Sequence, residues 1–289
     1  MTSLQSFTPA QLAFLEELLC PSSEPVVALA EDDGTHGGGG GEGCDDDGEE
    51  ASPCDLPAID GTNKADTLTG GGGSQHYRGL NGNDTLSGGG GRDCLEGNNG
   101  NDLLDGGPGR DFLFGGNGDD ELRGGKGRDD MYGENGNDLL IGGCGPDLMD
   151  GGRGDDVLFG GNSPDTYTGG TGSDVFVLAL PGNSGGHGET SGGANSLAPL
   201  GDEEVEGDVI TDFRQGVDRL ALAGGITLDQ LRHQGEKIYV MGGGHEEAAM
   251  LMPDGESGGD ARVLVTLLGF DTSQLRVTDF LSCADLFAV

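Results

Sequence analysis

The stretch Gly97-Asn-Asn-Gly-Asn-Asp-Leu-Leu-Asp-Gly-Gly-Pro-Gly-Arg-Asp-Phe-Leu-Phe114 contains two consecutive copies of a nine-residue unit. The unit recurs from Gly61 to Val177 without insertion or deletion, which gives 13 units in 117 residues. Its consensus is Gly-Gly-x-Gly-x-Asp-x-(apolar)-x. A fixed period of this kind indicates a repeat architecture before any local secondary-structure preference is considered.

Three columns of the repeat are almost invariant. Position 1 is glycine in all 13 units, and position 6 is aspartate in twelve, with Gln75 as the exception. Position 8 is always a large apolar residue, which composition alone does not explain. The position-8 residues are Leu68, Tyr77, Leu86, Leu95, Leu104, Leu113, Leu122, Met131, Leu140, Met149, Leu158, Tyr167 and Phe176.

The columns predict an all-β fold. Glycines let positions 1 to 6 turn tightly, and positions 7 to 9 then form a short strand. Side chains alternate along a strand, so position 8 points one way and positions 7 and 9 point the other. Two units form one coil of a right-handed parallel β-roll, a β-helix solenoid, with position 8 inside. A flexible glycine-rich linker is the alternative, but a linker has no reason to keep position 8 apolar.

The aspartate column predicts metal binding. The Asp residues of units n and n+2 stack one coil apart, at about 4.8 Å, beside exposed turn carbonyls. Such hard oxygen ligands suit Ca²⁺, which takes about six to eight of them. Thirteen units give eleven such pairs and ten have Asp on both sides, so we expect about ten Ca²⁺ ions, each shared by two coils. The neutral amide of Gln75 should weaken the site shared with Asp93. Without metal, glycine entropy and stacked carboxylates should leave the repeats disordered.

These repeats resemble a known family. The stretch Asp93-Cys-Leu95, followed by Gly100-Asn-Asp102-Leu-Leu104-Asp-Gly106-Gly107 and Asp111, is similar to the signature of the RTX, or hemolysin-type, calcium-binding repeat. The resemblance implies that turn carbonyls and the position-6 carboxylates bind calcium. The implied metal ligands are Asp66, Asp84, Asp93, Asp102, Asp111, Asp120, Asp129, Asp138, Asp147, Asp156, Asp165 and Asp174.

The charge composition argues against some classes of binding partner. The 52 acidic and 14 basic residues give a net charge of −38, which argues against nucleic acid and anionic membranes as partners. No apolar run is long enough for a transmembrane segment. Residues 1–63 contain no Lys or Arg, whereas a secretory signal peptide needs a basic region at its start.

The flanks divide the chain into further regions. Residues 1–60 are predicted to contain an amphipathic helix, which starts at a Thr8–Gln11 capping box, and an acidic, glycine-rich disordered segment. Residues 61–177 form the β-roll, 178–207 a disordered linker and 208–289 a C-terminal capping and secretion region. The strands expected there are Asp208–Phe213, Asp218–Leu222, Lys237–Met241, Ala248–Met252 and Arg262–Leu268, with a short helix over Thr227–Arg232.

One outward face of the β-roll turns apolar toward its end. On the sheet of odd-numbered units, positions 7 and 9 begin as Thr and Ser and end as Leu139, Ile141, Val157, Phe159, Val175 and Val177. Contiguous apolar patches mark interfaces. We therefore expect residues 208–289 to pack on this face and to cap the last open coil. The N-terminal helix is the alternative cover, and a partner protein or a second copy is another.

The six cysteines show no C-x-x-C pair of the zinc or thioredoxin kind. Cys94 and Cys144 are expected on the β-roll surface. In an oxidising compartment Cys44 and Cys54 could form a disulfide, and unpaired thiols are the alternative.

Catalytic motifs are incomplete. His245-Glu-Glu-Ala-Ala249 lacks the second histidine of H-E-x-x-H, and Gly182-Asn-Ser-Gly-Gly186 lies in a linker without the strand and helix of a nucleophile elbow. We therefore expect a non-enzyme: a secreted calcium-binding RTX protein, extracellular or at the surface of a bacterium. The alternative is an accessory or remnant of an RTX protease or lipase.

The resemblance also implies export by type I secretion machinery, since the C-terminal residues 285–289 are acidic and then apolar.

Overall fold

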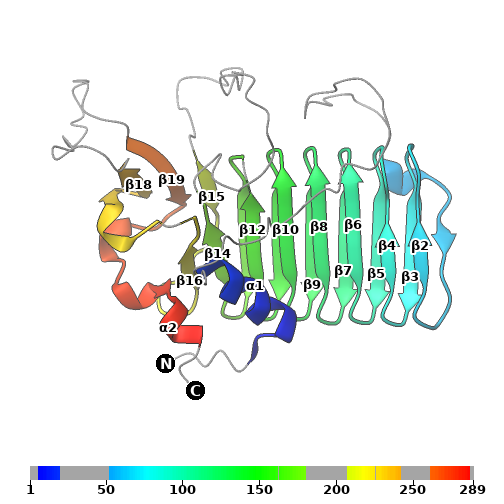
Figure 1. The fold of residues 1–289 in the computed structure, drawn as a ribbon, viewed down its shortest axis with the longest axis horizontal. Coiled ribbons are helices and arrows are strands. Elements are labelled where there is room, and N and C mark those ends of the chain that lie inside the picture. The colour runs from blue at the N-terminus through cyan, green and yellow to red at the C-terminus, as the bar shows by residue number, and fades with distance from the viewer. Residues whose placement is uncertain are drawn as a thin grey trace.

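The fold is a parallel β-solenoid in a computed structural model, which describes residues 6–19, 52–161, 163–179, 207–224, 226–241 and 261–286. Its coils stack along the long axis of the molecule, with a small β cap at the C-terminal end (Figure 1). The predicted parallel β-roll is therefore confirmed. Residues 182–186 and 245–249, which carry the incomplete catalytic motifs, lie outside the described residues.

Two sheets enclose the core. The eleven-stranded sheet has the order β1 (Ile59–Asp60), β3 (His76–Asn81), β5 (Cys94–Asn99), β7 (Phe112–Asn117), β9 (Asp130–Asn135), β11 (Leu148–Arg153), β13 (Thr166–Thr171), β15 (Asp208–Ile210), β19 (Ala261–Leu267), β18 (Lys237–Met241) and β17 (Leu231–Gln234). The nine-stranded sheet has the order β2 (Thr67–Thr69), β4 (Thr85–Ser87), β6 (Leu103–Pro108), β8 (Glu121–Lys126), β10 (Leu139–Cys144), β12 (Val157–Gly161), β14 (Val175–Leu178), β16 (Arg219–Leu222) and β20 (Phe280–Leu281).

Few helical segments accompany the sheets within the described residues. They are the α-helices α1 (Pro9–Leu19) and α2 (Cys283–Leu286) and the 3₁₀ turns η2 (Pro53–Asp55), η3 (Leu228–Gln230), η4 (Thr272–Gln274) and η5 (Val277–Asp279).

The position-8 side chains form the core. Neighbouring strands pair in parallel with an 18-residue step, so that Leu104, Leu122 and Leu140 follow one another in register. The position-8 residues from Tyr77 to Phe176 are all buried. Leu68 is only partly buried because its coil is the first and has a neighbour on one side only. A roll of this kind therefore hides one apolar residue per unit.

The strands are longer than predicted. We expected them to cover positions 7 to 9, but most span six residues and continue through position 3 of the next unit. Gly107 and Gly125, both at position 2, are paired across β6 and β8. Their φ angles of 94° and 110° are accessible to glycine at little cost, so these glycines bend the strand without leaving the sheet.

The C-terminal region caps the open coil, as predicted. β15 pairs with β13 and β16 pairs with β14, both in parallel, so each sheet continues past the last repeat. β19, β18 and β17 then pair antiparallel, and Phe213 packs on Phe270 with ring centroids 5.3 Å apart. This cap covers the end of the core, where an unpaired edge would otherwise be open to other chains.

The predicted elements of this region are partly correct. The strands expected at Asp208–Phe213, Asp218–Leu222, Lys237–Met241 and Arg262–Leu268 correspond to β15, β16, β18 and β19. Ala248–Met252 lies outside the described residues. The helix expected over Thr227–Arg232 is only a 3₁₀ turn, because β17 begins at Leu231 and is drawn into the sheet by β18.

The cover of the apolar outward face differs from our first expectation. Helix α1 lies across the nine-stranded sheet at the end of the array (Figure 1), and α2 of the C-terminal region adds Leu286 to the same apolar cluster. Phe14 and Leu15 pack there against a cluster that includes Val157, Phe159 and Val177, and the Phe14 and Phe159 rings are 5.8 Å apart. The C-terminal strands β16 and β20 extend this sheet at its edge instead of lying on it.

Polar contacts fix the position of α1. Thr8 and Gln11 form the predicted capping box, in which the Thr8 amide donates to Gln11 Oε1 and the Gln11 amide donates to Thr8 Oγ1. Gln11 is fully buried, and its Nε2 also donates to the carbonyls of Asp138 and Asp155 at 3.0 and 2.9 Å. One glutamine therefore both starts the helix and attaches it to the β-roll.

Two expectations about cysteines are corrected. Cys94 is not on the surface: it is fully buried and forms a disulfide with Cys54. Cys54 therefore does not pair with Cys44, which lies outside the described residues. The chain segment containing η2 covers the outward side of β5 and brings Cys54 to Cys94. Cys144 is half-buried and forms no disulfide.

Candidate metal centre

The aspartates of position 6 form two ladders along the roll. Each carboxylate after that of Asp66 accepts, through Oδ1, the backbone N–H of the position-6 residue one coil earlier. The Asp102 amide donates to Asp120 at 2.7 Å and the Asp120 amide donates to Asp138 at 2.8 Å. The same 18-residue step links all ten predicted Asp–Asp pairs and the Gln75–Asp93 pair. The structure thus brings together the carboxylates that the repeat predicted as neighbours.

The second oxygen of most of these carboxylates has no partner. Ten of the twelve Oδ2 atoms are buried without a hydrogen bond: those of Asp84, Asp93, Asp102, Asp111, Asp120, Asp129, Asp138, Asp147, Asp156 and Asp165. A buried, unsatisfied polar oxygen is costly, and a charged one more so. Ten such atoms, repeated at a fixed step along the two ladders, offer oxygen ligands that suit a cation.

A carbonyl oxygen of the next coil lies beside seven of these ten orphaned atoms, those of Asp84, Asp102, Asp111, Asp120, Asp129, Asp138 and Asp147. A Cβ placed on Gly115 would lie 2.5 Å from Asp120 Oδ2 and 2.9 Å from the carbonyl oxygen of Gly133, which belongs to the next coil. A Cβ on Gly124 would likewise lie 2.5 Å from Asp129 Oδ2 and 2.7 Å from the Gly142 carbonyl oxygen. Position 1 must be glycine because the Cβ of any other residue would clash with these oxygens. The oxygen-only lining fits Ca²⁺, which binds carboxylates and carbonyls.

Burial disfavours the charged form of the ladder carboxylates. It raises the pKa of Asp111 to about 9, with Asp129 nearby as a second cause, and the pKa of Asp147 to about 10, with Asp129 and Asp165 adding repulsion. Burial also raises the pKa of Asp93 and Asp102, near the open first coil, to about 6. The remaining raised pKa values are about 7 for Asp120, Asp129 and Asp174, about 8 for Asp138 and about 9 for Asp156 and Asp165.

The raised pKa values show that the folded ladder needs positive charge to keep its carboxylates ionised. At neutral pH the carboxyls with the most strongly raised pKa values, such as Asp111 and Asp147, would be protonated in the fold, whereas in the unfolded chain they would be ionised. A bound dication favours the ionised form and removes the repulsion between stacked carboxylates. The residues present therefore fit a cation of the calcium class.

Gln75 leaves one position of the ladder altered. Its Oε1 lies where the other units place Asp Oδ2 and is also buried without a partner. Its Nε2 donates a hydrogen bond to the carbonyl of Gly73 in its own turn. The unit therefore offers a neutral oxygen and uses one turn carbonyl internally, which is consistent with the predicted weak site beside Asp93.

Sequence reasoning missed the last members of both ladders. The Asp165 amide donates to Asp208 Oδ1 at 3.1 Å, and the Asp174 amide donates to Asp218 Oδ1 at 3.3 Å. Both residues keep the Asp-x-apolar pattern of positions 6 to 8, as Asp208-Val-Ile210 and Asp218-Arg-Leu220. The steps of 43 and 44 residues hide them from a search at a period of nine.

Arg214 binds the last two carboxylates of one aspartate ladder. Arg214 donates through one terminal nitrogen to the Gly172 carbonyl at 2.8 Å, to Asp174 Oδ2 at 3.0 Å and to Asp218 Oδ1 at 2.8 Å. These partners are a turn carbonyl and the carboxylates of two successive coils. The guanidinium thus supplies positive charge at the last step of this ladder. The other ladder ends on the Tyr167 hydroxyl, which donates to Asp208 Oδ2 at 3.3 Å.

Comparison with protein families agrees with this geometry. The model of the RTX calcium-binding nonapeptide repeat matches residues 58–74, 69–104, 78–113, 105–140, 114–149 and 141–176. The repeat array belongs to the RTX family. Its matched region ends before the cap, so Asp208, Asp218 and Arg214 lie outside it. A comparison with curated proteins finds no match.

Two solved structures show a weak likeness to this chain. The AlgE6R3 subunit of an Azotobacter vinelandii mannuronan C5-epimerase is 24% identical, with a TM-score of 0.24, over 60% of this chain and 83% of that one. The extracellular lipase LipA of Serratia marcescens is 16% identical, with a TM-score of 0.22, over 78% of this chain and 40% of that one. Among the described residues, no helix is long and apolar enough to cross a membrane.

Proposed function

We propose that this chain is a secreted, non-enzymatic calcium-binding protein whose RTX array folds when several Ca²⁺ ions bind. The observation that carries the proposal is the row of ten buried carboxylate oxygens without a partner. The twelve position-6 aspartates would be the ligands, together with turn carbonyls such as that of Gly133. Bound calcium would supply positive charge between successive coils.

The arrangement couples binding to folding. Each position-6 carboxylate uses one oxygen to hold the coil before it and leaves the other for the cation. A ligand set of this kind exists only when neighbouring coils are stacked, so the binding free energy stabilises the folded array. Arg214 and Tyr167 complete the ladders at the cap.

Circular dichroism during a calcium titration, with calorimetry in parallel, tests the proposal. The strand signal should be absent in excess chelator and should appear cooperatively with Ca²⁺, with a midpoint of roughly 10⁻⁴–10⁻³ M, the range of extracellular calcium modules. Mg²⁺ should fail at the same concentrations because it demands a small octahedral site. A full strand signal in chelator at neutral pH would contradict the proposal.

The coupling between calcium binding and folding also suits export of the chain from the cell. A chain that stays unfolded where calcium is scarce suits passage through a narrow secretion channel, and we propose type I export to the outside or surface of a bacterium. Deleting residues 230–289 should retain the protein inside the cell. Since the deletion also removes β17 to β20, the control is Leu231→Asp, which damages the cap and leaves the end of the chain intact. Undiminished secretion of the deletion would refute type I export.

A screen for hydrolase activity tests the proposal that this chain is not an enzyme. Ester and peptide substrates should be turned over no faster than by a sample with the array unfolded in chelator. Calcium-dependent hydrolysis by the purified chain would favour the hydrolase-related alternative instead.

A further inference from the structure

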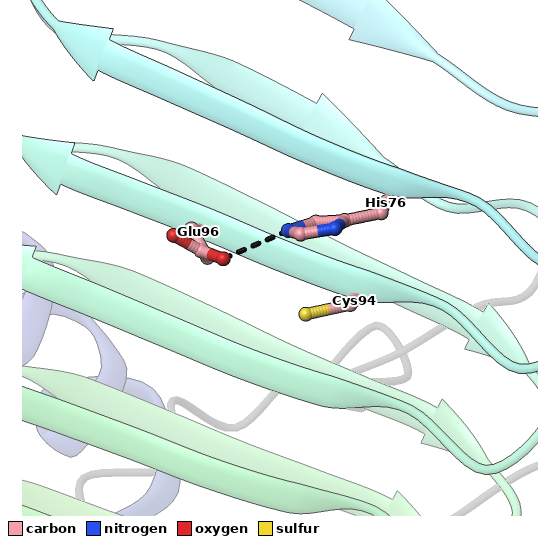
Figure 2. A group of neighbouring side chains, drawn as sticks. All are labelled: His76, Cys94 and Glu96. Carbon is pink, nitrogen blue, oxygen red and sulfur yellow. Dashed lines mark hydrogen bonds and ion pairs between the residues drawn. The ribbon is translucent and has the colours of Figure 1, made fainter. Parts of the chain in front are cut away.

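A second cluster of metal-ligating side chains lies on the outward face of the eleven-stranded sheet. His76 begins β3, and Cys94 and Glu96 lie on the adjacent strand β5 (Figure 2). In the sheet, His76 is directly opposite Cys94. One ligand atom from each of the three side chains lies within 4.8 Å of the other two. These residues occupy positions 7 and 9 of their units, so none belongs to the aspartate ladders.

The cluster is enclosed by the segment that precedes the array. Cys94 is fully buried and the His76 side chain is 8% exposed, while the Glu96 side chain is 31% exposed. The burial results from the segment around η2, which carries Cys54 and Leu56 over β3 and β5. The site therefore has a buried nitrogen and sulfur and one carboxylate facing solvent.

The orientation of His76 is that of a metal-binding histidine. Its Nδ1 lies 2.9 Å from the carbonyl oxygen of Leu56, which can only accept, so Nδ1 carries a proton. Its Nε2 lies 2.8 Å from Glu96 Oε1, which is also an acceptor when ionised, so a metal at this nitrogen would take the place of the hydrogen bond to Glu96. Metal-bound histidines commonly donate one ring N–H to a backbone carbonyl, which leaves the other nitrogen for the metal.

The disulfide keeps both sulfurs from acting as ligands. Cys54 Sγ is bonded to Cys94 Sγ, and only a thiolate is a good metal ligand. We propose that reduction of this disulfide opens a Zn²⁺ site formed by Cys54, Cys94, His76 and Glu96. The site goes beyond the calcium function and uses none of the ladder carboxylates.

Reduction requires a dithiol. Its thiolate attacks one sulfur of the disulfide to form a mixed disulfide, and its second thiol then releases the chain. The dithiol is oxidised to a disulfide, and Cys54 and Cys94 gain two electrons and two protons in total. When Zn²⁺ binds, the two thiols lose their protons to solvent. A disulfide oxidant of the same chemical class reverses the step, removes two electrons and releases the zinc.

The geometry and the ligand types suit zinc. Tetrahedral Zn²⁺ with bonds of about 2.0–2.3 Å places its ligand atoms roughly 3.3–3.8 Å apart. The His76, Cys94 and Glu96 ligand atoms are at most 4.8 Å apart, so shifts of about 1 Å suffice for these three, with Nε2 and Oε1 moving slightly apart. Once the disulfide is reduced, Cys54 Sγ would move away from Cys94 Sγ to a coordination distance of its own. Thiolate and imidazole favour Zn²⁺, whereas the oxygen-only ladders favour Ca²⁺. In either redox state the segment around η2 would stay attached to β5, by the disulfide or by the metal.

Co²⁺ binding to the full chain in saturating Ca²⁺ tests the site. The background carries Cys20, Cys44, Cys144 and Cys283 replaced by Ser, so that only Cys54 and Cys94 remain. After reduction this chain should bind one Co²⁺ with a thiolate-to-cobalt charge-transfer band, and Zn²⁺ should abolish the band. The oxidised chain should show no band. Circular dichroism in each sample confirms that the array is folded.

Two variants assign the other ligands. His76→Ala and Glu96→Gln should each weaken Co²⁺ binding by about tenfold or more, while His233→Ala, an exposed histidine in the cap, should leave it unchanged. If His76→Ala fails to fold, Glu96→Gln alone tests the ligand assignment. Three results would overturn the site: no band in the reduced folded chain, equal Co²⁺ binding in the oxidised chain, or Glu96→Gln binding as tightly as the His233→Ala control.

Discussion

A central ladder aspartate accepts a hydrogen bond through one oxygen and offers the other to a cation. Its position in the array determines how much stability is lost when it is replaced. Asp120 accepts from the Asp102 amide, donates to Asp138 and leaves Oδ2 for a cation. Asp66, at the first coil, donates to Asp84, and its Oδ2 already accepts from Thr62. A hydrogen bond to a charged group contributes about 1.5–3 kcal/mol.

Asp120→Ala should therefore raise the calcium midpoint of folding more than Asp66→Ala does. We expect the central variant to lose about 2 kcal/mol or more in saturating calcium, since stability in a solenoid is roughly a sum over neighbouring units. Calcium titrations followed by circular dichroism measure both midpoints. Asp120→Asn, which keeps an oxygen acceptor without the charge, separates the hydrogen bond from cation binding. Equal midpoints for the two alanine variants would contradict the graded array.

Arg214 is the one described side chain that supplies positive charge directly to a ladder carboxylate pair at the cap. Arg214→Gln would leave Asp174 and Asp218 buried without a counter-charge. Because the Arg214 side chain is 38% exposed, the cost should lie below the roughly 3–5 kcal/mol of a fully buried pair. We expect the thermal midpoint of the cap to fall at limiting calcium. The control is Arg123→Gln, whose partly exposed pair with Glu121 should contribute under about 1 kcal/mol. Equal thermal midpoints for Arg214→Gln and Arg123→Gln would refute this role.

At the scale of elements, helix α1 is held by apolar packing and by polar contacts. Leu15 is fully buried against the nine-stranded sheet, and Gln11 donates to two carbonyls of the roll. Both partners lie late in the array, where the outward residues are apolar. The helix can therefore dock only after these coils have formed.

Leu15→Ala should loosen α1 without unfolding the array. Replacing a buried Leu by Ala costs about 2–5 kcal/mol, which is large for a single short helix. In calcium, we expect more binding of a hydrophobic dye and faster amide exchange in α1, with the strand signal retained. Glu16→Ala, on the exposed side of the helix, is the control. Unchanged dye binding and exchange in Leu15→Ala would show that α1 is not the cover of this face.

At the scale of the whole molecule, pH should act in opposite directions with and without calcium. Burial raises the pKa of Asp111 to about 9 and that of Asp147 to about 10, above the ordinary value of about 4 in the unfolded chain. The folded, metal-free array therefore binds more protons than the unfolded chain. Its stability is fully present below about pH 4 and is lost as the pH rises through the folded pKa values.

In chelator, we accordingly expect strand signal to increase as the pH falls from about 8 to about 5. In limiting calcium, the same acidification should raise the calcium midpoint, because protons compete with the cation for the carboxylates. Circular dichroism across this range measures both; staying above the isoelectric point near 4.1 limits precipitation. A pH-independent calcium midpoint would mean that the ladder carboxylates do not titrate on binding.

Much of the fold and of the candidate site follows from the sequence alone. A period of nine with one apolar column defines which residues face inward, and Leu104, Leu122 and Leu140 lie in register as it predicts. The same period fixes the 18-residue step between ladder aspartates such as Asp102 and Asp120. Both results are local: within an uninterrupted repeat, each residue's neighbours are set by its position in the unit.

Other features were decided only by the tertiary structure. The Cys54–Cys94 disulfide, the docking of α1, and the place of Asp208, Asp218 and Arg214 at the ladder ends all join residues separated by irregular lengths of chain. No period encodes these separations. They depend on which surface each segment can bury once the roll exists: α1 and the C-terminal strands both carry apolar residues that suit the open face, and only packing in three dimensions assigns the helix to the face and the strands to the end.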